Sequence, residues 1–344
     1  MIRISDRSSG QWLRGLRTGL LVAAVAFSAS ALAGDSPSSI ALDAFRSEIV
    51  SGGPPKDGIP SIDDPQFTTA SKAAYLDDGD IVFGIVRNGQ ARAYPRRILA
   101  SHEIVNDRLA GRNVAITYCP LTATAIGFYR GDTTFGVSGR LVNSNLVMYD
   151  RQTDSYWPQM LATAVKGPRK GERLNSFPVI WTTWKAWRDA HPDTQVMTRN
   201  TGYARDYSRD PYGSYNPAGG YYAPGSPLMF PVMNSDDRLA KKTTVVTAVS
   251  PDGALAVAKD RLRSKGVIRI DQGTGRYLAV HDATLNNGRI YQLPEETDVD
   301  PGKVELTAQG LMANGEPLRS ERLITWDAFW FAWVAFYPEA VIAG

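Results

Sequence analysis

The sequence has a single cysteine, Cys119, and it has no apolar run long enough to cross a bilayer. One cysteine cannot form an internal disulfide, so the core alone must hold the fold together. The two densest apolar stretches, residues 20–26 and 326–336, fall well short of the roughly 20 residues that a membrane-spanning helix needs. We therefore expect no transmembrane segment in the mature chain.

The first 33 residues have the composition of an export signal. Arginines at 3, 7, 14 and 17 precede the short apolar run of residues 20–26, and the stretch ends in Ala31-Leu32-Ala33. A basic start, a short apolar run and a small-x-small site together indicate a cleavable secretory signal peptide. We predict that residues 1–33 are removed and that the mature protein is secreted into the periplasm.

The net charge of the chain is also small once residues 1–33 are excluded. The chain carries a formal charge of +3, and residues 1–33 alone hold four arginines and one aspartate. The mature chain is therefore close to neutral, and it has no stripe of Lys and Arg interleaved with aromatics. Nucleic-acid binding needs such a basic surface, so we expect no nucleic-acid partner.

Self-comparison indicates an internal repeat. Residues 81–93 and 244–256 both follow a strand–turn–strand pattern, with Asn88-Gly89 in the first and Asp252-Gly253 in the second. These dipeptides supply the positive φ angles of tight hairpins. Further on, residues 184–187 and 330–333 resemble each other as short aromatic helices that end near a proline. The first copy has extra residues between its hairpin and its helix, around 131–159.

The repeat leads to a division of the chain and to a fold class. We predict an α+β fold, mainly antiparallel β, in which two tandem repeats of hairpin, short helix, strands and aromatic helix share a core. The predicted parts are a signal peptide (1–33), an N-terminal arm (34–60), repeat 1 (61–198), a connection rich in Tyr, Gly and Pro (199–235) and repeat 2 (236–344).

The residues most suggestive of chemistry are Cys119 and His102, both in repeat 1. Cys119 ends an apolar strand at a Cys-Pro turn, and the offset between the repeats places Ala283 opposite it. Thiolate and imidazole bind copper or zinc, and Met148 offers a third ligand of the type found in copper sites. We therefore expect a transition-metal site, redox-linked in its role, in the first repeat only.

Two other interpretations of these residues stay open. His102 could deprotonate Cys119 to give a thiol enzyme, which predicts a lowered pKa for the thiol. A lone cysteine is also often a small buried apolar residue, and Met148 fits a core position. The neighbouring Glu103 and Asp107 could be paired carboxylates, but we favour the solvated side of a loop for both.

The connection offers a function of a different class. Aromatic residues alternate with charged ones from 203 to 222, and rigid tyrosines suit ligand recognition. We expect a non-catalytic binding loop, or else a clamp between the repeats. The candidate binding residues are Tyr203, Arg205, Asp206, Tyr207 and Tyr212.

An ordered set of motifs carries a resemblance to a known family. The motifs are residues 102–107, Thr117-Tyr118-Cys119-Pro120-Leu121, residues 135–139, Asn143-Ser144, residues 148–151 with Trp157, residues 202–207 and residues 329–333. From about residue 56 to its end the chain resembles the prokaryotic domain-of-unknown-function 3179 family, whose name brings no activity. The family turn usually continues as Cys-Pro-Leu-Cys. Here Thr122 replaces the second cysteine, so the resemblance implies a role for His102 and Cys119 but no dithiol mechanism.

Overall fold

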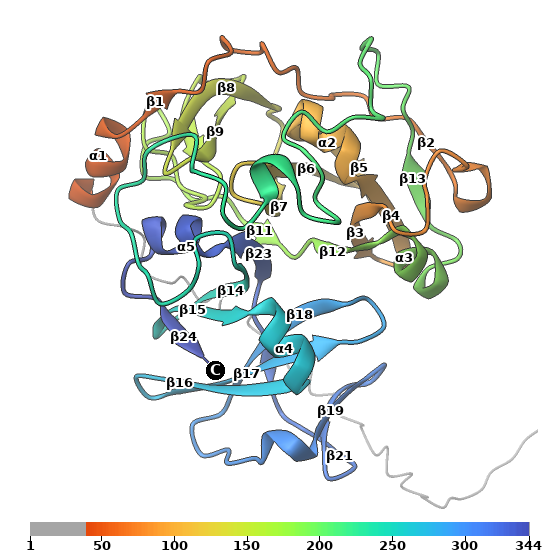
Figure 1. The fold of residues 1–344 in the computed structure, drawn as a ribbon, viewed down its shortest axis with the longest axis vertical. Helices are drawn as coiled ribbons and strands as arrows, with labels where there is room; N and C mark the ends of the chain where they lie inside the picture. The colour runs from red at the N-terminus through yellow and green to blue at the C-terminus, as the bar shows by residue number, and fades with distance from the viewer. Residues whose placement is uncertain (1–38, 344) are drawn as a thin grey trace, which may run out of the picture. The chain divides into compact units, whose positions relative to one another are not determined.

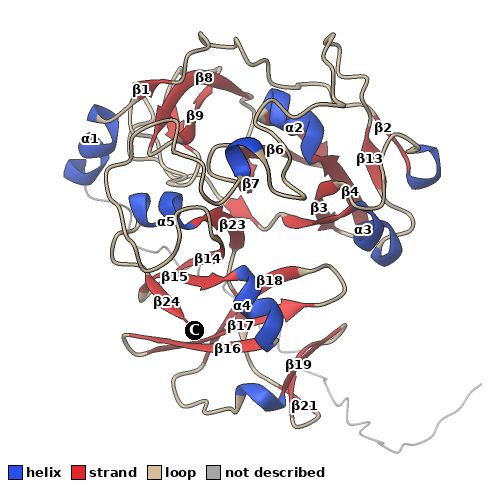
Figure 2. Ribbon diagram, viewed as in Figure 1, coloured by secondary structure: helices blue, strands red, loops and turns tan. Residues whose placement is uncertain are grey.

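Antiparallel strands dominate the fold, as the sequence predicts, and the helices are short (Figures 1 and 2). The computed structural model describes residues 39–343, so the predicted signal peptide lies outside the described part. Within that part no helix is long and apolar enough to cross a membrane. The described helices are α1 (Ser39–Ser47), α2 (Arg96–His102), α3 (Trp184–Ala190), α4 (Lys259–Lys265) and α5 (Trp330–Phe336), with 3-10 turns at Ala70–Lys72, Gly220–Tyr222 and Pro301–Lys303.

The first half of the chain begins with the hairpin of β3 (Ile81–Arg87) and β4 (Gln90–Pro95). Asn88 and Gly89 connect the two strands at φ values of 47° and 76°, which confirms the predicted tight turn. The same sheet adds β12 antiparallel to β3, and β13 between β4 and β2. The bounds of the added strands are β2 (Phe67–Thr69), β12 (Ile180–Thr183) and β13 (Gln195–Met197).

Two more four-stranded sheets complete this half. One has the order β11-β7-β6-β5 and carries the cysteine, and the other has the order β1-β8-β9-β10. The second of these lies in the segment where the sequence indicated extra residues. The strands are β1 (Val50–Ser51), β5 (Ile104–Leu109), β6 (Arg112–Cys119), β7 (Thr124–Tyr129), β8 (Phe135–Val142), β9 (Asn145–Asp150), β10 (Tyr156–Pro158) and β11 (Ser176–Phe177).

The second half runs through a similar order of pairings. In the first sheet β12 is antiparallel to β3 and β13 is parallel to β4; in the second half β23 is antiparallel to β14 and β24 is parallel to β15. A helix and a three-stranded meander follow each hairpin. The boundaries of the two repeats stay a prediction. The strands are β14 (Thr244–Ser250), β15 (Gly253–Ala258), β16 (Val267–Gln272), β17 (Gly275–Asp282), β18 (Asn287–Leu293), β19 (Val304–Thr307), β20 (Gly310–Ala313), β21 (Glu316–Pro317), β22 (Glu321–Arg322), β23 (Thr325–Phe329) and β24 (Val341–Ala343).

The second hairpin differs from the turn that its sequence predicts. Pro251 and Asp252 form the connection, and Gly253 already belongs to β15, where its φ is 126°. Proline fixes φ near −65°, so Pro251 cannot adopt the positive φ that the expected turn type needs at its first position. The Asp-Gly dipeptide therefore marks the hairpin without being its two central residues.

The two halves share one core. Trp330 and Trp333 of α5 lie in the same buried cluster as Tyr118 of β6 and Trp157 of β10. Each is fully buried, which stabilises the fold by roughly 1.5–3 kcal/mol per large apolar side chain. The shared core brings the C-terminal strands and helix against the sheet that carries Cys119.

Candidate functional site

Cys119 is the last residue of β6, where the strand turns through Pro120 into β7. Its side chain is only 1% exposed. Its backbone pairs with Thr124, and the amide of Ala123 donates to the carbonyl of Pro120 across the turn. The cysteine is therefore held by a short, hydrogen-bonded turn at the edge of the shared core.

Opposing influences act on the thiol of Cys119. Burial raises its pKa to about 11, with a further increase from the nearby carboxyl of Glu103. The hydroxyl and amide of Thr122 and the amide of Leu146 donate hydrogen bonds to the sulfur and act in the opposite direction. The thiol also donates to the carbonyl of Ser144 at 3.7 Å. The pKa is raised and not lowered, so the structure does not give the activated thiol that a Cys–His enzyme needs.

Glu103, whose carboxyl influences the pKa of this thiol, is buried, so our assignment of it to a solvated loop is wrong. Glu103 is only 6% exposed. Burial raises the pKa of its carboxyl to about 8, so the group is protonated at neutral pH. Among the described residues no hydrogen bond or ion pair reaches this carboxyl, and its oxygens keep slight contact with solvent, since they are not among the fully buried atoms without a partner. Leaving a buried polar group unpaired costs about 1–3 kcal/mol, which makes Glu103 an unusual residue to find in a core.

Asp107, assigned to the same solvated loop, is also buried, but its role is structural. Its carboxylate accepts from Arg92 and from the hydroxyl of Tyr94, both at 2.6 Å, and from the amide of Arg108. A buried carboxylate with this many donors is fully paired. The contrast with the unpaired Glu103 separates a structural acid from a candidate site residue.

The connection between the halves covers the cysteine turn. The hydroxyl of Tyr221 donates to the carbonyl of Leu121 at 2.8 Å, and the amide of Tyr221 donates to the carbonyl of Tyr212. The pKa of the Tyr212 hydroxyl is raised by burial and then by the charges of Glu103 and Cys119. The two regions that the sequence singled out separately therefore meet at one site.

Unusual backbone conformations gather around the same sulfur. Positive φ values occur at Glu103 (59°), Ala123 (49°), Asn143 (52°) and Ser144 (59°). Such conformations cost non-glycine residues of order 1–3 kcal/mol, and they often occur at functional sites. Asn143 and Ser144 are the two central residues of the β8–β9 hairpin, where positive φ is the usual geometry, so Glu103 and Ala123 are the unusual positions here.

The second half of the chain helps to hold this arrangement. The amide of Phe329, at the end of β23, donates to the carbonyl of Thr122 at 2.9 Å. The side-chain amide of Asn143 donates to the carbonyl of Ala335 in α5 at 3.0 Å. The turns on both sides of the sulfur are therefore fixed by residues from the C-terminal part of the chain.

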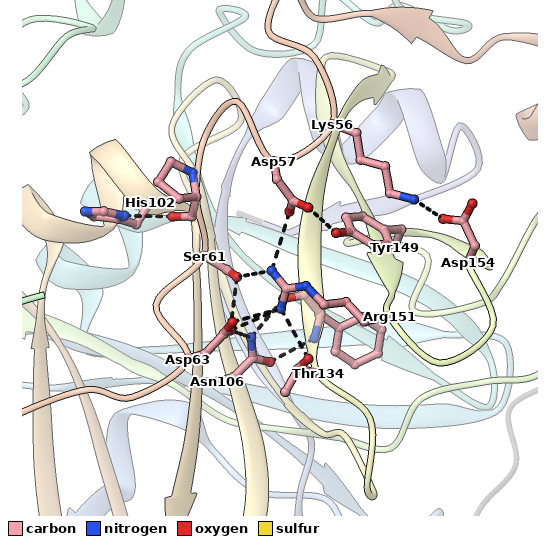
Figure 3. Close-up of polar contacts among 12 residues, drawn as sticks. Lys56, Asp57, Ser61, Asp63, His102, Asn106, Thr134, Tyr149, Arg151 and Asp154 are labelled. Atoms are coloured by element: carbon pink, nitrogen blue, oxygen red, sulfur yellow. Dashed lines mark hydrogen bonds and ion pairs between the residues drawn. The ribbon is translucent and has the colours of Figure 1, made fainter. Parts of the chain in front are cut away.

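His102 is fully buried, but its ring is occupied by hydrogen bonds. Nδ1 lies 2.7 Å from the carbonyl of Pro60 (Figure 3). Nε2 lies 2.6 Å from the hydroxyl of Tyr207. A carbonyl only accepts, so Nδ1 carries the proton and Nε2 accepts from Tyr207. Tyr207 in turn accepts from the hydroxyl of Thr201. Burial lowers the pKa of His102 to about 4, so the ring is neutral.

The arm that supplies Pro60 is fixed by Arg151, which follows β9 (Figure 3). The guanidinium donates to the hydroxyl of Ser61 at 2.9 Å and to the carboxylate of Asp63 at 3.1 Å, and it pairs with Asp57 at 3.5 Å. In Figure 3 Asp57, Ser61 and Asp63 converge on Arg151, and His102 lies on the opposite side of this segment of the chain. Arg151 therefore sets the position of the chain segment against which His102 is held.

Met148 and the five binding-loop candidates differ in how far they are exposed to solvent. Met148 is fully buried in β9, within the shared core. Tyr203 is 45% exposed and Arg205 and Asp206 are exposed, whereas Tyr207 is only 4% exposed and Tyr212 is half-buried. A buried ion pair of Asp210 with Arg96 of α2, at 2.5 Å, anchors this segment. The five candidates therefore do not form one open surface.

The chemistry available at Cys119 follows from its neighbours. The thiol of Cys119 and the carboxyl of Glu103 are acids, and a metal ion that binds them would displace their protons into solvent. Thr122 and Leu146 would help to stabilise the resulting thiolate. No group of three or more His, Cys, Asp or Glu side chains that could hold a metal occurs among the described residues. Any ion here would have Cys119 and Glu103 as its two acidic protein ligands.

Glu103 is the site residue that the sequence did not reveal, and Tyr212 was expected in a binding loop and not near the cysteine. Their importance depends on burial and on proximity, and the printed sequence shows neither. One signal was present: Glu103 directly follows His102 within a motif of the family resemblance.

Comparison with known proteins gives a family without an activity. Residues 56–340 match the family described as "Protein of unknown function (DUF3179)". No curated protein and no solved structure matches the chain.

Proposed function

We propose that this chain, which belongs to the DUF3179 family of proteins of unknown function, is exported to the periplasm and binds a divalent transition-metal ion at Cys119 and Glu103. The export part rests on the signal pattern of residues 1–33. The metal part keeps the cysteine that the sequence indicated, and it puts the carboxyl of Glu103 in place of the imidazole of His102.

The observation that carries the proposal is the unpaired carboxyl of Glu103 beside a buried thiol. A buried carboxyl that makes no hydrogen bond destabilises the fold unless something else compensates for it. A metal ion that replaces the protons of both groups would supply the missing partner. The strained backbone at Glu103 is a further cost, of the kind that functional sites commonly carry.

Charge balance favours a divalent ion. A thiolate and a carboxylate together carry two negative charges, so a doubly charged cation leaves a neutral buried site. Zinc accepts both sulfur and carboxylate oxygen, whereas copper(I) prefers sulfur ligands. The replacement of an imidazole by a carboxyl in the expected ligand set therefore shifts the proposed metal from copper toward zinc, and it leaves no redox step.

Cys119 and Glu103 do not fill a tetrahedral coordination shell. The phenol oxygen of Tyr212 offers a third ligand, and the remaining position would fall to water or to a bound molecule. A position open to exchange is typical of catalytic zinc and not of structural zinc. His102 stays outside this ligand set, because its acceptor nitrogen already receives the hydrogen bond of Tyr207.

Calorimetric titration with zinc tests the proposal. Both ligands are protonated at pH 7, so binding should release two protons, seen as a heat that varies with the ionisation enthalpy of the buffer. Glu103→Gln and Cys119→Ala should each weaken binding by about tenfold or more, and each should release one proton fewer. Glu172→Gln, a change at an exposed glutamate, is the matched control.

The same titration separates the alternatives. His102→Gln should leave zinc binding intact, since the proposed ligands remain. Binding that is lost in His102→Gln and kept in Glu103→Gln would return the site to the Cys–His pair. No stoichiometric binding by the wild type would refute the metal proposal. Export is tested separately by fractionating expressing cells, where a periplasmic product that begins near Gly34 is expected.

A further inference from the structure

A pocket of about 460 Å³ lies where three parts of the chain meet, and neither Cys119 nor Glu103 lines it. Its walls come from β12 with Trp181 and Thr182, from the connection with Tyr215 and Tyr222, and from the second half with Lys242 and Arg263. We propose that this pocket binds a small organic anion with a flat apolar body. The proposal is independent of the metal site.

Aromatic rings form one wall of the pocket. The rings of Trp181 and Tyr215 are 5.0 Å apart between centroids, and those of Tyr215 and Tyr222 are 5.3 Å apart. Rigid, mutually packed rings provide contact area at little entropic cost, so the flat part of a ligand would bind here.

Positive charge dominates the opposite side. Lys259 is paired with Asp327, and Arg263 is paired with Asp260 at 3.0 Å. Lys242 differs, because the described residues bring no carboxylate to it. Its ammonium donates to the carbonyls of Tyr221 and Pro227 and to the hydroxyl of Ser226, and it lies 3.5 Å from the centre of the Tyr221 ring. The pocket therefore has a buried cation that no acid neutralises.

Burial of Lys242 is costly without an anion. Lys242 is only 5% exposed, and desolvation lowers the pKa of its amine to about 8. A bound anion would stabilise the charged form and would offset part of that desolvation. This charge imbalance favours an acidic ligand over a neutral one of the same shape.

The unpaired hydroxyl of Thr182 also favours a ligand that carries an oxygen acceptor. Thr182 is 3% exposed, and its Oγ1 is buried without a hydrogen-bond partner although the residue lines the pocket. A buried hydroxyl without a partner costs about 1–3 kcal/mol. A carboxylate or other oxyanion oxygen would accept its hydrogen. Thr182 is thus a second, independent feature that indicates a ligand.

A second, adjoining pocket differs from the first in that its charged side chains are paired. It has a volume of about 230 Å³ and shares Ile81, Tyr215 and Asn216 with the first. Its charged residues are paired with each other, Arg96 with Asp210 and Arg97 with Asp80. The cation excess therefore belongs to the larger pocket, and we assign the acidic group of the ligand to that side.

Titration with 2-naphthoate, followed by ligand-observed NMR and calorimetry, tests this inference on the mature full-length chain. The neutral isostere 2-naphthalenemethanol has the same ring but no charge, so it should bind at least about fivefold more weakly. Arg263→Gln and Thr182→Val should each weaken naphthoate binding by about fivefold. Arg261→Gln, a change at an exposed residue of the same helix that does not line the pocket, should have no effect.

The outcomes are decisive in either direction. Stronger binding of the anion, with a loss in the two pocket variants only, supports the proposal. Equal binding of both probes, equal effects of Arg263→Gln and Arg261→Gln, or no binding at all would overturn it. Since Arg263 is exposed, its variant is expected to fold even if Thr182→Val does not. Cys119→Ala should bind naphthoate like the wild type, which keeps this test separate from the metal test.

Discussion

The hydroxyl of Tyr207 donates a hydrogen bond of 2.6 Å to Nε2 of His102, although the two residues are 105 positions apart in the chain. This contact joins the two regions in which the sequence placed function, the His–Cys segment and the tyrosine-rich connection. It also fixes the protonation of the ring, because the Pro60 carbonyl requires the proton on Nδ1. His102 therefore holds the connection in place over the site.

Replacing Tyr207 with Phe should destabilise the protein by about 1–3 kcal/mol, because the buried acceptor Nε2 loses its only donor. Urea denaturation followed by tryptophan fluorescence measures the change. Tyr203→Phe is the matched control, since Tyr203 packs near the same imidazole at 5.3 Å but is exposed. Equal stability of the two variants would show that the His102–Tyr207 bond contributes nothing.

The stability of the metal-free protein should fall as pH rises from 6.5 to 8. The folded chain keeps the proton on Glu103 up to about pH 8, whereas the unfolded chain releases it near its ordinary value of 4.5. Folding is therefore linked to proton uptake, with a slope of up to about 1.4 kcal/mol per pH unit. Glu103→Gln should remove this slope, which chemical denaturation at several pH values in the presence of a chelator would measure.

The pH range of 6.5 to 8 is chosen because below it the titration of His102 changes stability in the opposite direction to that of Glu103. The folded ring stays neutral down to about pH 4, whereas the unfolded ring takes up a proton below its ordinary value of 6.5. Its contribution to stability is present above pH 6.5 and is lost as pH falls toward 4. Between pH 4.5 and 6.5 the two groups offset each other. A wild-type slope between pH 6.5 and 8 that persists in Glu103→Gln would contradict the assigned pKa.

Replacing Arg151 with Ala should release the arm from β9 and lower stability by about 1–2 kcal/mol, because Ser61 and Asp63 lose their common donor. Limited trypsin digestion should then cut after Lys56 faster than in the wild type. Arg188→Ala, which breaks an exposed ion pair with Asp78, is the control and should leave that cleavage rate unchanged. An unchanged rate in Arg151→Ala would show that other contacts suffice to hold the arm.

Replacing Thr122 with Cys should strengthen zinc binding by about tenfold or more, because the Thr122 hydroxyl already contacts the Cys119 sulfur and a second thiolate would arise beside it. Competition with a chromophoric zinc chelator measures the affinity under reducing conditions. Thr133→Cys adds a buried thiol elsewhere and should leave the affinity unchanged. Equal affinities of Thr122→Cys and the wild type would place the metal away from Cys119.

Much of the fold followed from local sequence patterns. The two strand–turn–strand patterns predicted antiparallel strands, and Asn88-Gly89 predicted a hairpin turn that is present. The tryptophans of α3 and α5 are fully buried, as their helical spacing indicated. These features depend on residues close together in the chain, whose preferences the surrounding structure does not override.

The site was predicted only in part, for a physical reason. Cys119 could be singled out because it is the sole thiol and ends a strand. Glu103 could not, because a glutamate in an exposed loop and one in a dry pocket look alike in sequence. Its burial depends on a left-handed backbone conformation, which is rare for glutamate, and on a covering tyrosine more than a hundred residues away.

The hydrogen bond from Asn143 to Ala335 spans 192 residues, and the bond from Phe329 to Thr122 is similarly long in range. The turns around Cys119 therefore cannot close until almost all of the chain is available to fold. A chain that emerges N-terminus first from an export channel would present its thiol in an open, unformed site throughout most of translocation. On the proposed function, a ligand would therefore reach Cys119 only after the C-terminal strands and helix have folded around it.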